Sequence, residues 1–221
     1  MSTGINLYGL SRSVYTRIAR LTLEEKSVAY QLTETEIFGP GGVPPEHLAR
    51  HPFGRIPVLV CGAISLYETA AICRYVDEAY EGPALQPTNP VVRARVAQII
   101  GILDSYFYRP AVWGVFVERI GRPLQGKLPD EKVIDAALPQ VRTALNALCA
   151  LQQGAPYLAG EALTLADLHA FPMLKYLSLA PEGKAEVEGR RSLAEWLALL
   201  EGRASVQRTR SQFEQAPTEA A

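Results

Sequence analysis

The residues of this chain best suited to bind a ligand lie in two short stretches, 50–60 and 66–72. Pro57 stands directly before an apolar run, and because proline cannot donate a hydrogen bond to a sheet, it belongs at a strand start. An X-Pro bond at such a start can adopt the cis form at little cost. Glu68 and Thr69 follow where a strand gives way to a helix, and the N–H groups at a helix start attract anions. The pattern predicts a pocket for a small zwitterionic peptide.

Strand and helix signals alternate through the first third of the chain. Short apolar runs bounded by turn residues predict strands, and apolar residues at three- and four-residue spacing predict helices. The predicted strands are 5–8, 28–32, 56–60 and 64–66, and the predicted helices are 11–25 and 68–80. Strand, helix, strand, hairpin and helix is the thioredoxin order, which builds a mixed four-stranded sheet with helices packed on it.

An all-helical pattern begins at Asn89, a predicted helix cap with Pro90 at the first helical position. Pro139 interrupts a later apolar stripe and is expected to kink or divide that helix. Thr164 and Asp167 match a capping box, so we assign Asp167 a folding role and no catalysis. The expected fold class is α/β plus all-α, with a thioredoxin-like domain over 1–82, a linker over 83–89, an all-helical domain over 90–210 and a disordered tail over 211–221.

The composition excludes several other classes of protein. The 221 residues carry a formal net charge of −1 without a basic stripe, so nucleic acid is not expected as a partner. No apolar run approaches the roughly 18 residues that a membrane span requires, so no membrane partner is expected either. The three cysteines are widely spaced and the three histidines show no ligand-like spacing. We therefore expect reduced thiols, no metal and a cytoplasmic protein.

Four stretches resemble the plant phi-type glutathione transferases, and the resemblance covers about residues 5 to 205. Tyr8–Arg17 resembles the family's first strand and helix without a gap, and Phe53–Pro57 its aromatic-Gly-Gln-apolar-cis-Pro stretch. Glu68–Thr69 is similar to its Glu/Gln-Ser pair, and Tyr157–Asp167 to its helical-domain signature. The chain is identified as a member of the cytosolic glutathione S-transferase family, of a bacterial, phi-like serine type.

The resemblance implies that Ser13 is the catalytic residue and that glutathione is the co-substrate. A thiol with a pKa of about 8.5 is only a few per cent thiolate at neutral pH. A hydrogen bond to a charged partner contributes about 1.5–3 kcal/mol, and the positive end of a helix adds a few tenths, so a serine hydroxyl there can stabilise the thiolate. Serine at a helix start is also the usual cap. Two alternatives to Ser13 as the group that stabilises the thiolate remain. They are the neighbouring serine Ser11 and, at the strand end, Tyr8.

The resemblance also implies how glutathione is held. Glu68 would face the ammonium of the ligand, while Thr69 and the helix start would face the neighbouring carboxylate. Ile56 would pair with the cysteinyl backbone, a form of strand addition. The family's His-Lys pair for the glycyl carboxylate falls on Gly42 and Val43, which carry no charge. The glutathione-binding residues expected are Ser13, Arg55, Ile56, Glu68 and Thr69, with Arg55 as the compensating charge.

We expect the second substrate to be a small hydrophobic electrophile or a hydroperoxide. Its pocket is expected to include Leu10, Tyr106, Tyr108 and Trp113. A symmetric homodimer is expected, in which Phe53 is the aromatic key that enters the partner's helical domain. Two alternatives remain: a non-catalytic interaction module, which typically loses the ligand residues, and a glutathione-dependent isomerase of the zeta type, whose Ser-Ser-Cys stretch is not matched by Ser11–Ser13.

Overall fold

A four-stranded mixed sheet organises the first part of the chain in the computed structural model, which describes residues 4–214. Its strands are β1 (Ile5–Gly9), β2 (Tyr30–Glu34), β3 (Val58–Cys61) and β4 (Ile64–Tyr67), in the order β2-β1-β3-β4. β1 and β2 are parallel, whereas β3 runs antiparallel to both β1 and β4. This arrangement confirms the predicted thioredoxin-like sheet.

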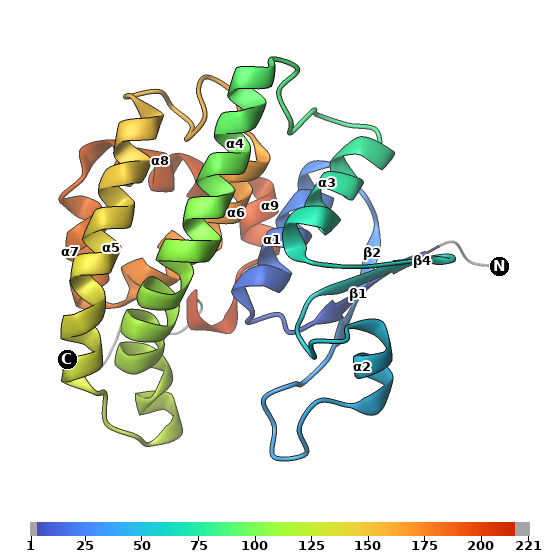
Figure 1. The fold of residues 1–221 in the computed structure, drawn as a ribbon, viewed down its shortest axis with the longest axis horizontal. Helices are drawn as coiled ribbons and strands as arrows, with labels where there is room; N and C mark the ends of the chain where they lie inside the picture. Colours follow the sequence, from blue (N-terminus) through green and yellow to red (C-terminus); the bar gives the residue numbers. More distant parts are fainter. Residues whose placement is uncertain (1–3, 215–221) are drawn as a thin grey trace. The chain divides into compact units, whose positions relative to one another are not determined.

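Helices cover both faces of this sheet. They are α1 (Val14–Glu25), α2 (Pro45–Arg50) and α3 (Thr69–Ala79). In Figure 1, α1 and α3 lie on one face of the sheet and α2 lies on the other. Alternate residues of β1 are buried, as expected for a strand with one face against helices. Leu7 of β1 packs with Leu59, Ile72 and Val76 in the core between the sheet and its helices.

The second strand begins two residues later than the predicted start at Val28. The chain leaves α1 through Ser27, whose φ of 54° lies in the left-handed region that often ends a helix. The Val28 N–H still donates to the Leu23 carbonyl at 2.9 Å. Because these residues close the helix, strand pairing starts only at Tyr30, opposite Ile5.

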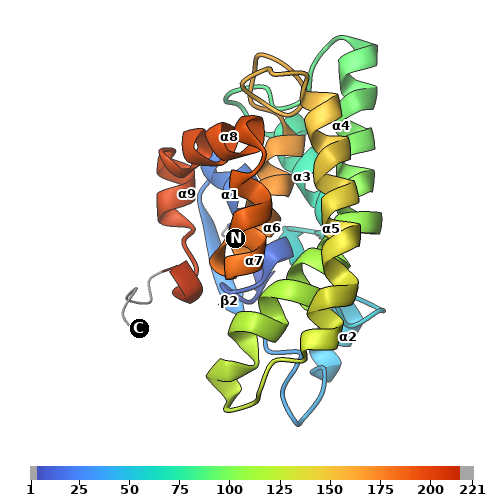
Figure 2. The same cartoon turned by 90° about the vertical axis from the view of Figure 1, so that its left-hand side faces the viewer.

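The second compact unit, Leu85–Arg203, is helical throughout. Its elements are α4 (Pro90–Ile102), the π-helical segments η1 (Leu103–Phe107) and η2 (Arg109–Gly121), the short 3-10 turn η3 (Pro123–Gln125), α5 (Glu131–Gln152), α6 (Leu165–Leu179), α7 (Pro181–Glu188) and α8 (Arg191–Glu201). α6 contacts α4, η2, α7 and α8 and is the central helix of the unit (Figure 2). Nearly every residue of α6 is buried accordingly.

The start of α4 follows the sequence prediction. Asn89 accepts hydrogen bonds from the backbone N–H groups of Val91 and Val92 at 2.9 and 3.3 Å, and Pro90 occupies the first helical position. The helical backbone then continues through η1 and η2 to Gly121, widening into π-helical turns from Leu103 onward. Such turns are rare and are frequent at functional sites.

The helix α5 does not divide at Pro139, so that part of the prediction is wrong. The helix runs from Glu131 to Gln152 with the proline inside it. A proline removes the hydrogen bond to the carbonyl four residues earlier, here that of Asp135. Both residues are exposed, so water can satisfy the freed carbonyl.

The C-terminal segment belongs to the first unit. The chain from Ala204 onward groups with the residues up to Ala84, and both views place α9 (Ala204–Arg208) beside α1 (Figures 1 and 2). The sequence predicts a helical domain that extends to residue 210 and disorder over 211–221. For 211–214 the prediction of disorder is wrong, because the carboxylate of Glu214 is buried against Arg17; residues 215–221 lie outside the described residues.

Candidate functional site

Ser13 is the N-cap of α1 and stands at the end of the loop that follows β1. Its φ and ψ are −76° and 132°, and its Oγ accepts from the Thr16 N–H at 3.4 Å. Its own N–H donates to the Leu10 carbonyl at 2.9 Å, and its carbonyl accepts from the Arg17 N–H at 2.9 Å. The side chain is half-buried. The capping bond is long and uses only an oxygen lone pair, so the hydroxyl hydrogen remains available to a ligand.

The other two candidate donors have different surroundings. The Ser11 N–H donates to both carboxylate oxygens of Glu34 at 3.1 Å, which holds this residue at the end of β2. The guanidinium of Arg50 lies 4.2 Å from the centre of the Tyr8 ring, within the range of a cation–π interaction. Tyr8 is therefore packed against a cation on the sheet, which favours a structural role for its ring.

The peptide bond between Ile56 and Pro57 is cis, which confirms the conformation expected at this strand start. Both residues are buried, whereas the neighbouring Arg55 is exposed. A buried histidine, His47, bonds through Nε2 to the Arg55 carbonyl oxygen at 2.7 Å. His47 thus holds the approach to the cis bond from α2, a role that the sequence analysis missed because it considered the histidines only as metal ligands.

His51 supports the same loop from within. Its Nδ1 accepts from the Phe53 N–H at 3.3 Å, and its ring lies 4.7 Å from that of Tyr67. Burial lowers the pKa of His51, which keeps Nδ1 able to accept this bond. The Phe53 side chain points outward and is 70% exposed.

Glu68 has a backbone conformation that glutamate rarely adopts. Its φ is 69° and its ψ is 111°, at the N-cap of α3. A non-glycine residue held there costs on the order of 1–3 kcal/mol, and such strain clusters at ligand sites. The exposed carboxylate makes no capping bond to α3, so the side chain of Glu68 does not serve as a helix cap. Thr69, the first residue of α3, is buried.

The residues expected to bind the electrophile fall in both units. Leu10 is buried in the first. In the second, the Trp113 Nε1–H donates to the Tyr108 hydroxyl at 3.1 Å. Tyr106 and Trp113 line a groove of about 1000 Å³ with η2 and α5, and Tyr108 is not among its lining residues. The floor of the groove is tightly packed, because Gly114 lies directly against α5.

Asp167 acts as a folding element, as predicted. It completes a capping box with Thr164, whose N–H and Oγ donate to Oδ2 at 2.8 and 2.9 Å. Its Oδ1 accepts from the Leu158 N–H at 2.8 Å and from the Trp196 Nε1–H at 2.9 Å. Burial raises the pKa of Asp167, while the four donated bonds act in the opposite direction. The carboxylate joins the start of α6 to a loop and to α8.

Within residues 4–214, no group of three or more His, Cys, Asp or Glu side chains is placed to hold a metal ion. In the same range, no helix combines the length and the apolar character needed to cross a membrane.

Comparison with known proteins agrees with this geometry. Residues 7–84 match the family model of the glutathione S-transferase N-terminal domain, and residues 101–204 match that of the C-terminal domain. Glutathione S-transferase F10 of Arabidopsis thaliana is 33% identical over 190 residues, which are 85% of this chain and 87% of the relative. This chain belongs to the glutathione S-transferase family. The chain is therefore a glutathione transferase by enzyme class. The expected bacterial source stays a prediction.

Solved structures give the same result. Glutathione S-transferase III in its apo form has a TM-score of 0.86 at 30% identity, covering 98% of this chain and 100% of that one. Glutathione S-transferase I, bound with the ligand lactoylglutathione, has a TM-score of 0.82 at 28% identity, covering 93% of this chain and 98% of that one.

Proposed function

We propose that the protein activates glutathione for attack on an electrophile and that Ser13 stabilises the thiolate. The observation that carries this proposal is the position of its hydroxyl at the first turn of α1, where Oγ accepts from the Thr16 N–H and keeps its hydrogen to donate. The sulfur then lies where the helix dipole favours negative charge. Capping and thiolate stabilisation are compatible roles of one side chain.

In the reaction, the glutathione thiol loses its proton to solvent, and a sulfur lone pair forms the new bond to the electrophile. A leaving group departs with its electron pair, or, in an addition, the electrons move onto the acceptor. A hydroperoxide is the alternative substrate: the thiolate sulfur attacks its outer oxygen, the O–O bond breaks, and the alkoxide takes up a proton to leave as the alcohol. A second glutathione thiolate then displaces the oxygen of the resulting sulfenic acid as water and forms the disulfide. The hydroxyl at Ser13 stabilises the anion in either case and need not act as a base.

The proposed glutathione pocket consists of Arg55, Ile56, Glu68 and Thr69 with Ser13. Glu68 supports this assignment best, because its strained backbone holds an exposed carboxylate that α3 does not use. The buried Thr69 hydroxyl and the start of α3 suit the adjacent carboxylate of the ligand. Arg55 is exposed beside the cis bond and would meet the glycyl carboxylate.

The groove beside α5 is better suited to a second copy of the chain than to the electrophile. Its lining is largely apolar and includes Tyr106 and Trp113, and the chain presents an exposed aromatic, Phe53, on a loop held by His51. In a two-fold dimer each copy supplies one Phe53 and one groove. The contacts expected of Leu10 and of Tyr108 with a small hydrophobic electrophile stay predictions from the resemblance.

The competing functions are weaker. An interaction module would not need Ser13, the cis Ile56–Pro57 bond and Glu68 together, and all three are present. A zeta-type isomerase would need the cysteine that the first helix lacks. Retention on immobilised glutathione, followed by a panel of model electrophiles and hydroperoxides, separates these functions, because an interaction module would turn over no substrate whether or not the column retains it.

Ser13→Ala tests the mechanism itself. We expect the pKa of the bound thiol, read from the ultraviolet absorbance of the thiolate, to rise, while glutathione affinity stays nearly unchanged. Ser11→Ala is the matched control and should leave this pKa at the wild-type value. An unchanged pKa in Ser13→Ala, together with a rise in Tyr8→Phe, would transfer the role to Tyr8.

A further inference from the structure

The segment Ala204–Glu214, which we call the C-terminal strap, is fastened along the length of α1. Near the C-terminal end of that helix, the Ser205 hydroxyl donates to the carboxylate of Glu25. One residue earlier in α1, Glu24 accepts from Arg208 Nε at 2.5 Å. Both contacts fall within the first unit.

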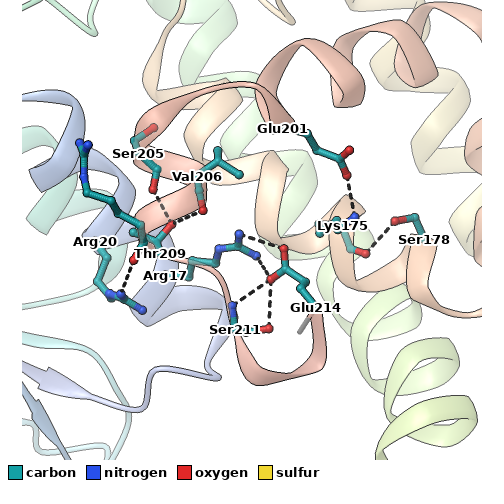
Figure 3. Close-up of polar contacts among 11 residues, drawn as sticks. Arg17, Arg20, Lys175, Ser178, Glu201, Ser205, Val206, Thr209, Ser211 and Glu214 are labelled. Atoms are coloured by element: carbon teal, nitrogen blue, oxygen red, sulfur yellow. Dashed lines mark hydrogen bonds and ion pairs between the residues drawn. The ribbon is translucent and has the colours of Figure 1, made fainter. Parts of the chain in front are cut away.

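The last anchor of the strap lies about two turns nearer the start of α1. Figure 3 shows Glu214 between Arg17 and Ser211. Nη1 and Nη2 of Arg17 donate to the two carboxylate oxygens of Glu214 at 2.5 and 3.1 Å. The N–H and hydroxyl of Ser211 donate to the Glu214 oxygen Oε1 at 3.1 and 3.0 Å. The strap therefore runs antiparallel to α1.

This anchor differs from the Arg208–Glu24 ion pair in its burial. The side chains of Arg17 and Glu214 are 0% and 4% exposed, whereas those of Arg208 and Glu24 are 56% and 20% exposed. Removing one partner of a buried ion pair leaves an uncompensated charge and is strongly destabilising, whereas an exposed pair contributes little. Of the two ion pairs that join the strap to α1, the Arg17–Glu214 pair therefore contributes more to its position.

Arg17 also belongs to the turn that carries Ser13. Its N–H donates to the Ser13 carbonyl at 2.9 Å, and its neighbour Thr16 donates to the Ser13 Oγ. A shift of the Arg17 backbone would move both bonds that orient the serine. A misplacement of about 1 Å far from the chemistry can cost on the order of 100-fold in rate.

We infer that Glu214 is a positioning residue for the reaction: it holds Arg17, and through Arg17 the first turn of α1, so that the Ser13 hydroxyl points at the glutathione sulfur. This inference rests on the proposed role of Ser13. It links the reactive end of α1 to a side chain 197 residues away from Arg17 in the sequence. In the sequence, the whole second unit lies between the sheet and this segment.

The test compares three single variants in the full chain. Glu214→Gln removes the charge and keeps the shape, and Ser211→Ala removes only one supporting hydrogen bond. Arg208→Gln is the matched control, because it breaks an exposed ion pair of the same strap. We expect the bound-thiol pKa to rise in Glu214→Gln, with a loss of kcat/KM on the order of 10-fold to 100-fold. A smaller rise is expected in Ser211→Ala, and wild-type values in Arg208→Gln.

A second background separates positioning from general stability. In Ser13→Ala, the additional change Glu214→Gln should leave the thiol pKa where Ser13→Ala alone places it, because the positioned hydroxyl is gone. If Glu214→Gln raised the thiol pKa equally in the wild-type and Ser13→Ala backgrounds, the inference about Glu214 would be overturned, and the role of Ser13 would stand. A wild-type thiol pKa in folded Glu214→Gln would have the same meaning. If Glu214→Gln does not fold, a wild-type pKa in Ser211→Ala would overturn it. An unchanged pKa in Ser13→Ala itself would overturn the role of Ser13 as well.

Discussion

Gly9 and Thr16 meet without room for another atom. A Cβ on Gly9, at the end of β1, would lie 2.4 Å from the Oγ1 of Thr16 and 2.8 Å from its Cγ2. Thr16 is fully buried, and its N–H donates to the Oγ of the N-cap residue Ser13. The backbone of Gly9 at the strand end therefore packs directly against the Thr16 side chain in the first turn of α1. This contact sets the distance of Ser13 from the sheet.

Gly9→Ala should accordingly displace the first turn of α1. Overpacking of this kind costs about 1–3 kcal/mol, and we expect lower stability together with a raised pKa of the bound thiol. The free energy of unfolding and the thiolate absorbance measure the two effects. Thr16→Ala in the same chain should restore both, since it removes the two clashing atoms. Gly41→Ala is the control, because a Cβ there meets nothing within 4 Å; equal effects of the two glycine changes would contradict the packing account.

Glu68→Gln should weaken glutathione binding without unfolding the protein. If the carboxylate meets the ligand's ammonium and is buried in the complex, its loss costs about 2–5 kcal/mol, while the strained backbone stays as it is. Calorimetric titration with glutathione measures the change. Glu78→Gln, which breaks the exposed pair with Arg74 on the outer part of α3, should bind as the wild type does. Wild-type affinity in Glu68→Gln would leave the proposed pocket unsupported.

Asp167→Ala should destabilise the protein by about 3 kcal/mol or more, because it leaves four buried donors without an acceptor, each worth about 1–3 kcal/mol. The donors come from Thr164, Leu158 and Trp196. Denaturant unfolding followed by Trp fluorescence reports the loss. Asp135→Asn changes an exposed carboxylate and should cost little. A folded Asp167→Ala with wild-type stability would remove this residue from the list of folding elements.

Phe53→Ala should weaken the proposed dimer by more than about 2 kcal/mol, as truncation of a buried aromatic anchor commonly does. Phe38→Ala removes another exposed phenylalanine, 61% accessible, and should leave association unchanged. Sedimentation equilibrium decides between these outcomes. A wild-type mass near the 24.2 kDa of one chain at micromolar concentration would exclude the dimer, and an unperturbed dimer in Phe53→Ala would exclude only the key.

The parts of this structure that follow from local chemistry were predictable. Pro57 before an apolar run and Asn89 before Pro90 each restrict the backbone of the next residues, and both expectations are confirmed. The late start of β2 was missed because Ser27 takes a left-handed conformation, which a serine in the sequence does not indicate. The role of His47 needs the fold to bring α2 beside Arg55.

The strap was not predictable at all. Most of its residues are polar, the last of them resemble a tail, and nothing in the local sequence of Arg17 indicates that its partner is Glu214. A buried ion pair between segments far apart in the sequence produces no periodicity or residue spacing from which it could be predicted. The expectation of disorder failed for residues 211–214 for this reason. The groove beside Tyr106 and Trp113 became visible only once α5 was placed against η2.

The strap has a consequence for the order in which the enzyme is made. A ribosome releases the sheet and α1 first, then the whole helical unit, and only afterwards residues 204–214. Until that moment the Arg17 guanidinium lacks Glu214, the carboxylate that balances it in the folded protein, so this ion pair forms only after the helical unit has been made. On the proposed role of Glu214, the reactive end of α1 takes its final geometry only after residues 204–214 have left the ribosome. A nascent chain that lacks these residues would then stabilise the glutathione thiolate poorly.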